Sequence, residues 1–155
     1  MTTSAVCAVD ETPIAGDVIR VASRMSEGLG LRLVLAHAVP VPTVPMPVTS
    51  GVAAARYAYP YPVDLEASRE GGEKLLERVA ARAEEPEGAE LRTVVGDPAE
   101  SLLSLAAEED AALIVVGSRG RGPLKAALLG SVSAALAARA ACPVLIVPPD
   151  TSRLP

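Results

Sequence analysis

The sequence predicts an α/β fold, a three-layer sandwich in which a five-stranded parallel sheet lies between two layers of helices. Short apolar runs alternate with segments of helical periodicity along the 155 residues, which is typical of parallel sheets covered on both faces. Aromatic residues make up only 2% of the chain, so the core must consist of smaller side chains that allow helices to pack closely on the sheet. A glycine-rich segment, residues 117–131, follows the fourth apolar run and indicates a ligand site.

The first part of the chain predicts a strand, a helix and a second strand. Residues 4–9 form a short apolar run that is typical of a buried strand. Thr12-Pro13 predicts a helix start with Thr12 as the N-cap, and Gly28 and Gly30 are expected to end this helix. Residues 31–39 are again largely apolar, which favours a strand covered on both faces. The expected apolar stripe of the helix is Ile14, Val18, Val21, Ala22, Met25 and Leu29.

The chain changes character at residues 40–62, which contain six prolines and all three tyrosines without periodicity. We expect an irregular loop there, either a flap or partner surface or an insertion without a specific role. A helix is expected over residues 64–84, weakened locally by the pair Gly71-Gly72. Two sets of side chains alternate over residues 90–95, Leu91, Thr93 and Val95 opposite Glu90, Arg92 and Val94, which predicts a half-exposed edge strand. The expected buried positions of the helix are Gly72, Leu76, Val79, Ala80 and Ala83.

The last part of the chain predicts two further helix–strand units. Asp97-Pro98 is typical of a helix start, and the apolar run over residues 112–116 predicts a central strand. A helix is expected over residues 131–141, ending before a proline, and a final strand over residues 144–147. The expected apolar stripe of the helix after Asp97 is Ala99, Leu102, Leu103 and Ala106.

Length and composition limit the classes of function. We expect residues 1–150 to form one domain and residues 151–155 to form a polar tail. The net charge of −5 argues against a general nucleic-acid binder or a binder of anionic membranes. The sequence shows neither a signal-peptide pattern nor an apolar run of membrane-spanning length, so we expect a cytoplasmic protein. The one histidine, His37, lies on an apolar strand and has no second histidine for a metal pair or a triad, so we interpret it as a structural strand residue rather than a catalytic one.

Residues 116–133 combine the parts of a phosphate site: the end of a strand, several glycines and the start of a helix. The free N–H groups in the first turn of a helix, together with its dipole, favour an anion. The P-loop pattern fails because Pro123-Leu124 follows Gly122, and the dinucleotide fingerprint fails because Lys125 occupies the third glycine position. The spacing present is Gly117, two residues, Gly120, nine residues, Gly130-Ser131.

This spacing resembles the ATP-binding motif of the universal stress protein (Usp) family, and residues 141–148 resemble the end of that family's domain. The resemblance implies a Rossmann-like, adenine nucleotide alpha hydrolase-like sheet of order 3-2-1-4-5, with the first and fourth strands ending at one crevice. It also implies a homodimer paired through residues 144–147. In this order the fourth strand separates Cys7 from Cys142, so we expect free thiols.

The resemblance also implies the positions of the ligand. Asp10 is expected beside the base and ribose, the alternative being an ordinary turn residue. The backbone of Val39 is expected to read adenine, and Arg119 to lie near ribose or phosphate. The full set of expected ATP-binding residues is Ala8, Val9, Asp10, Val39, Val116, Gly117, Arg119, Gly120, Gly130, Ser131, Val132 and Ser133.

The predicted function is that of an ATP-binding regulatory or stress-response protein that hydrolyses ATP slowly at most. We assign no catalytic residue and no metal ligand, since the chain lacks a Gly-x-Ser-x-Gly elbow and metal-binding spacings. The sequence leaves open whether Mg²⁺ accompanies the nucleotide and whether AMP or cAMP takes the place of ATP. The alternatives are an ATPase or AMP/cAMP-binding enzyme-like relative, and an interaction module without nucleotide.

Overall fold

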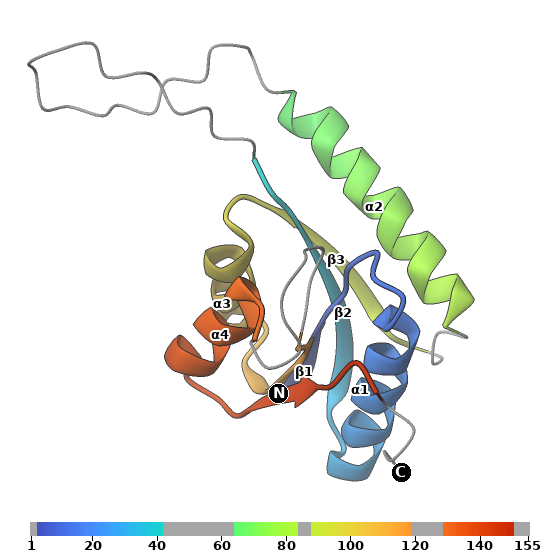
Figure 1. The fold of residues 1–155 in the computed structure, drawn as a ribbon. Coiled ribbons are helices and arrows are strands. Elements are labelled where there is room, and N and C mark those ends of the chain that lie inside the picture. The colour runs from blue at the N-terminus through green and yellow to red at the C-terminus, as the bar shows by residue number, and fades with distance from the viewer. Residues whose placement is uncertain (1–2, 42–63, 84–87, 119–128, 151–155) are drawn as a thin grey trace, which may run out of the picture.

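The computed structural model describes residues 3–41, 64–83, 88–118 and 129–150 (Figure 1). Five parallel strands form one sheet in the order β3-β2-β1-β4-β5, which confirms the predicted fold class and strand order. The strands are β1 (Ser4–Ala8), β2 (Arg32–Val39), β3 (Glu90–Val95), β4 (Ala111–Gly117) and β5 (Val144–Val147). The helices are α1 (Ala15–Leu29), α2 (Leu65–Arg82), α3 (Pro98–Glu108) and α4 (Ser131–Arg139).

Two apolar clusters lie on opposite faces of the sheet. Helices α1 and α2 cover one face and α3 and α4 cover the other (Figure 1). Successive side chains of a strand point to opposite faces, so Cys7 packs beneath α1 while Val6 packs on the side of α3 and α4. This two-sided burial explains why the strands read as continuous apolar runs. None of the helices in the described ranges is long and apolar enough to cross a membrane.

Helix α1 begins later than predicted, and its buried face overlaps the predicted stripe only in part, at Val18 and Ala22. Thr12 does not cap it, because its N–H and its hydroxyl both donate to the Asp10 carboxylate. The helix therefore starts at Ala15, after a turn in which Ala15 N–H donates to the Thr12 carbonyl at 3.1 Å. Met25 and Leu29 of the predicted stripe are 37% and 58% exposed. The buried positions are Ala15, Val18, Ile19, Ala22 and Ser26.

The other helix ends agree better with the sequence. Asp64 and Asp97 cap α2 and α3, each accepting a hydrogen bond from a first-turn N–H at 2.9 and 3.0 Å. Gly30 ends α1 in the left-handed conformation at φ 65°, as predicted, whereas Gly28, the other expected stop, lies within the helix. In α3 the prediction missed Leu105, which is buried together with Leu102 and Ala106.

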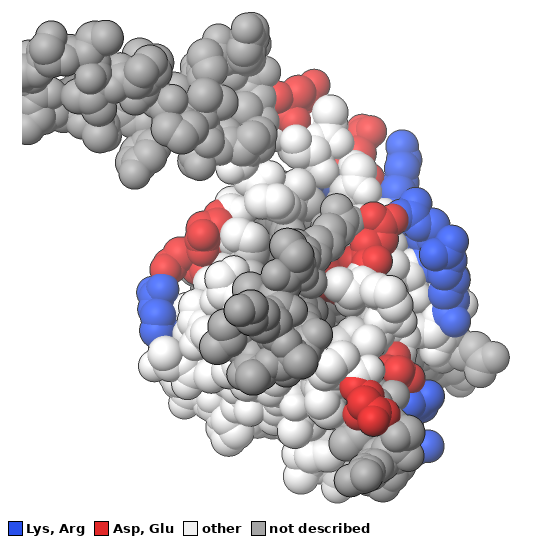
Figure 2. All heavy atoms as spheres, in the orientation of Figure 1, with Lys and Arg blue, Asp and Glu red and all other residues white. Residues whose placement is uncertain are grey.

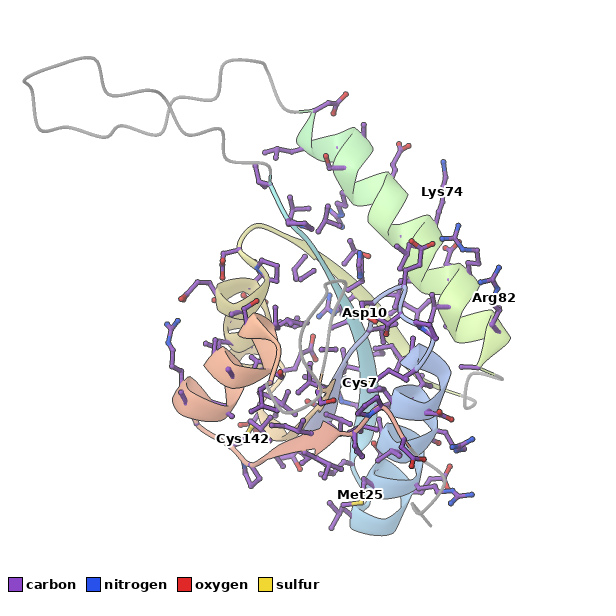
Figure 3. All side chains as sticks on the ribbon, viewed as in Figure 1. Cys7, Asp10, Met25, Lys74, Arg82 and Cys142 are labelled. Atoms are coloured by element: carbon purple, nitrogen blue, oxygen red, sulfur yellow. The ribbon has the colours of Figure 1, made fainter. Side chains whose placement is uncertain are left out.

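Both cysteines are free, as predicted. Cys7 lies within β1, and its burial, together with the charge of Asp10, raises the pKa of the thiol to about 12. Cys142 lies just before β5 and is partly buried, and this burial also raises its pKa (Figure 3). Neither thiol is therefore an activated nucleophile.

Thr93 in the edge strand β3 has a buried hydroxyl that finds no hydrogen-bond partner among the described residues. An unpaired buried hydroxyl lowers stability, whereas an apolar group of the same shape does not. Thr93→Val is therefore expected to raise the free energy of unfolding by about 1 kcal/mol. Urea unfolding of the variant and the parent protein measures this difference, and a less stable variant would show that the hydroxyl is satisfied in solution.

Candidate functional site

A cavity of about 250 Å³ opens at the carboxyl ends of the central strands. It lies where the chain order of the sheet reverses, with β1 between β2 and β4, which is the position at which parallel α/β sheets bind ligands. Nine of the residues expected from sequence line it: Ala8, Val9, Asp10, Val116, Gly117, Gly130, Ser131, Val132 and Ser133. The structure also brings in residues that the sequence analysis did not name, among them Thr12, Ala36, Ala38, Pro98 and Leu102.

The wall formed by β1 and β2 consists of small side chains. Ala8, Ala36 and Ala38 line the cavity on the side of the sheet that faces α3 and α4. Larger strand residues fill the same face further down, where Val6 and Val34 are fully buried. The change from valine to alanine towards the carboxyl ends leaves the space that forms the cavity.

Val39 does not line this cavity. Its carbonyl accepts a hydrogen bond from Gly96 N–H at 2.9 Å, on the β3 side of the strand. Because backbone groups of successive strand residues point to opposite edges, Ala38 directs its N–H and C=O towards the β1 side. There β1 has already ended, at Ala8. Ala38 therefore presents both backbone groups at the cavity, where Val39 was expected from the sequence.

The N-terminus of α4 forms the opposite wall. The first backbone bond of this helix runs from Ala134 N–H to the Gly130 carbonyl, so the amides of Ser131, Val132 and Ser133 have no partner within the helix. In the described part of the chain no side chain caps them, in contrast to the aspartate caps of α2 and α3. Three free amides and the helix dipole make this wall attractive to an anion.

The Ser133 hydroxyl forms its hydrogen bonds inside the protein. It is buried and lies within 3.0 Å of the Gly130 carbonyl and 3.2 Å of the Ser118 carbonyl, so its proton is used inside the protein. Gly130 N–H also donates to Ser118 at 2.8 Å, and Ser118 N–H donates to Val147. These bonds fix the end of β4 against the start of α4. Arg119 and Gly120, which were expected near the phosphates, lie outside the described residues.

Asp10 is the only acidic residue that lines the cavity among the described residues, and no lysine or arginine of those ranges lines it. It lies two residues after the end of β1 (Figure 3), and its Oδ1 accepts the hydrogen bonds from Thr12. The turn role is thus present, and Asp10 borders the cavity as well. In the view of Figure 2 the basic side chains gather mainly along α2. Because no described lysine or arginine lines the cavity, the amides at the start of α4 are the main positive feature of its described wall.

His37 lines the cavity and is held by a hydrogen bond, as expected of a structural strand histidine. Its Nδ1 lies 2.8 Å from the Val9 carbonyl oxygen. Since a carbonyl only accepts, Nδ1 carries the proton. Within the described residues no group of three or more histidine, cysteine or acidic side chains is arranged to hold a metal ion.

The sequence matches the Universal stress protein family over residues 1–148, and the chain therefore belongs to this family. Universal stress protein YxiE of Bacillus subtilis is 45% identical over 78 residues, which are 49% of this chain and 52% of that relative. The match thus spans about half the length of the curated relative.

Two solved structures share the fold. A universal stress protein in complex with cAMP is 24% identical, with a TM-score of 0.61 over 94% of this chain and 96% of that one. A family protein from Arabidopsis thaliana with AMP bound is 18% identical, with a TM-score of 0.55 over 98% and 96% of the two chains. At these identities the likeness concerns the fold.

Proposed function

We propose that this protein binds an adenine nucleotide, ATP in particular, in the cavity at the end of β1 and acts as a nucleotide-dependent stress-response regulator. The observation that carries the proposal is the pairing of two walls, the first-turn amides of α4 on one side and the N–H and C=O of Ala38 on the other, all without a partner among the described residues. The first wall suits phosphate and the second suits the edge of a base. That two solved family members bind cAMP and AMP supports the proposal.

The donor pattern of Ala38 matches adenine. Adenine presents an acceptor, N1, beside an amino donor, N6, and a strand residue offers an N–H and a C=O side by side. Guanine and hypoxanthine present an N–H donor at N1 and an acceptor at O6, so the same residue would face like groups. The Asp10 carboxylate then accepts from a ribose hydroxyl, and Gly117 with Gly130 leaves room for the phosphates.

Binding rather than turnover is the expected activity. The one acidic group in the described lining, Asp10, already accepts two hydrogen bonds from Thr12 and is poorly suited to act as a general base. If Mg²⁺ takes part, phosphate oxygens must supply most of its ligands, as magnesium sites commonly do. We further propose a cytoplasmic homodimer that pairs through β5, because this edge strand has one side of its backbone unpaired by the sheet.

Calorimetric titration tests this proposal: the nucleotide-free protein is titrated with ATP, ADP, AMP and cAMP, each with and without Mg²⁺. We expect micromolar binding of ATP that is tighter than binding of AMP, because more phosphate oxygens then reach the amides of α4. Absence of binding by all four nucleotides would overturn the proposed function. Release of ADP over minutes would instead favour the ATPase alternative.

Gly130→Val is expected to weaken ATP binding at least a hundredfold while the protein stays folded. Gly130 is buried at the cavity wall, and its backbone angles, φ −64° and ψ 159°, are accessible to any residue. The variant therefore adds bulk without backbone strain. Gly71→Ala, on the exposed side of α2, serves as the control that retains binding. Unchanged affinity in Gly130→Val would refute the assigned phosphate wall.

A further inference from the structure

The hydrogen-bond ladder between β1 and β2 lacks the one further bond that would continue it past Val9. The two strands run in register as far as Ala8 opposite Ala36, and Val9 N–H then donates to the Ala36 carbonyl at 2.7 Å. In a parallel ladder the next bond runs from Ala38 N–H to the Val9 carbonyl. No such bond is formed in the described part of the chain, and the Val9 carbonyl accepts instead from His37 Nδ1 at 2.8 Å.

The position of the imidazole explains why the two bonds compete. Ladder acceptors point along the plane of the sheet, whereas the side chain of His37 stands off this plane on the face covered by α2. A hydrogen bond to the ring therefore draws the Val9 carbonyl out of the direction that Ala38 N–H needs. The ring itself is confined, with Thr93 opposite it on β3 and Gly72 of α2 above it.

We propose that His37 is a positioning residue for base recognition: by donating to the Val9 carbonyl it ends the β1–β2 ladder early and keeps the N–H and C=O of Ala38 open to the adenine edge. This inference rests on the proposed nucleotide function. His37 makes no direct contact with the base in this scheme, and it acts through the Val9 carbonyl and the Ala38 backbone.

The inference predicts an effect on selectivity between bases rather than on overall binding. AMP and inosine monophosphate differ only at the edge that Ala38 would read, where hypoxanthine presents a donor at N1 and an acceptor at C6. The unmodified protein should prefer AMP by about ten- to hundredfold, because the wrong base leaves buried polar groups unpaired. If Ala38 instead pairs with Val9, this preference disappears.

Two variants at position 37 distinguish the effect of the hydrogen bond from the effect of the ring's shape. His37→Phe keeps a planar ring but removes the donor, whereas His37→Asn carries an amide nitrogen close to where Nδ1 lies and can restore the bond. We expect the AMP preference to fall about tenfold or more in His37→Phe, with little change for inosine monophosphate, and to return in His37→Asn. A preference retained in a folded His37→Phe protein would overturn the inference.

Hydrogen exchange of the Ala38 amide tests the same inference without nucleotide. In the unmodified protein this amide should exchange rapidly for a central strand, and in His37→Phe it should become protected as it joins the ladder. A protected Ala38 amide in the unmodified protein would overturn the inference even if nucleotide binding holds. Conversely, an open amide in a protein that binds no nucleotide would refute the proposed function and leave the role of His37 in the ladder intact.

Discussion

Replacing Gly72 by alanine is expected to lower the free energy of unfolding by about 1–2 kcal/mol, while the same change at Gly71 raises it by about 0.5–1 kcal/mol. A Cβ at Gly72 would lie 2.4 Å from Val39 Cγ2 and 2.8 Å from Thr93 Cγ2. Both neighbours are β-branched and stiff at χ1, so they cannot rotate away at low cost. Helix α2 must therefore move off the sheet. A Cβ at Gly71 meets no described atom within 4 Å.

The two glycines form a matched pair because they are adjacent in one helix and gain the same single methyl group. Alanine improves the intrinsic helix propensity of α2 at both positions by about 1 kcal/mol, so the difference between the variants isolates the contact with β2 and β3. Urea unfolding of the two variants measures this difference. If Gly72→Ala proves as stable as Gly71→Ala, α2 does not pack on the sheet as closely as described.

The contrast also shows where sequence reasoning reaches its limit. The interpretation of Gly71-Gly72 as a local weakness of the helix is appropriate for Gly71, where a side chain would point into open space. At Gly72 the absence of a side chain permits the close approach of α2 to Val39 and Thr93. Propensity is a property of one residue, whereas this contact depends on which residues of β2 and β3 lie opposite, and that follows only from the packed structure.

Features fixed by neighbouring residues were predictable. The alternation of strands and helices indicated the fold class, Asp97 marked the start of α3, and Gly30 marked the end of α1. The glycine spacing, with the family resemblance, brought Asp10, Gly117 and Gly130 to one cavity.

The structure differs from the sequence predictions in two situations. In one, a side chain has two possible hydrogen-bond partners; in the other, the strand register determines which backbone groups face the cavity. Thr12 looked like a helix cap but donates to Asp10, which shifted the start of α1. Ala38 and Val39 are both apolar strand residues, so the sequence alone does not distinguish their backbone directions. The hydrogen bond from Gly96 N–H to the Val39 carbonyl shows that Ala38 faces the cavity. The period-two rule combined with the β2–β3 pairing would have identified Ala38.

Glu109 is the second residue from which we expect a large effect, and no local pattern pointed to it. Its side chain is only 6% exposed, and it bonds with Arg32 at 3.0 Å and with Arg92 of the edge strand. Its backbone carbonyl accepts from the buried Ser4 hydroxyl at 2.9 Å. These contacts join the amino-terminal ends of β1 and β2 to β3, at the end of the sheet opposite the cavity.

Glu109→Gln is expected to lower the free energy of unfolding by about 1–3 kcal/mol at pH 7, since it removes a buried carboxylate from two arginines that remain partly exposed. The Arg92 and Arg32 guanidiniums hold the pKa of this carboxyl below its ordinary value of 4.5. A lowered pKa in the folded state means that the carboxylate stabilises the protein above about pH 4.5 and ceases to do so as the pH falls through the folded-state pKa.

Urea unfolding of the parent protein and Glu109→Gln across pH 7 to 3 therefore tests the cluster. The difference between the two proteins should be full at pH 7 and shrink progressively below pH 4.5, because the protonated carboxyl and the amide are both neutral. A difference independent of pH would mean that shape rather than charge accounts for the effect.

Nucleotide affinity should stay unchanged in this variant, because Glu109 lies at the amino-terminal end of the sheet and the cavity at the carboxyl end. A loss of affinity would show that the two ends are coupled.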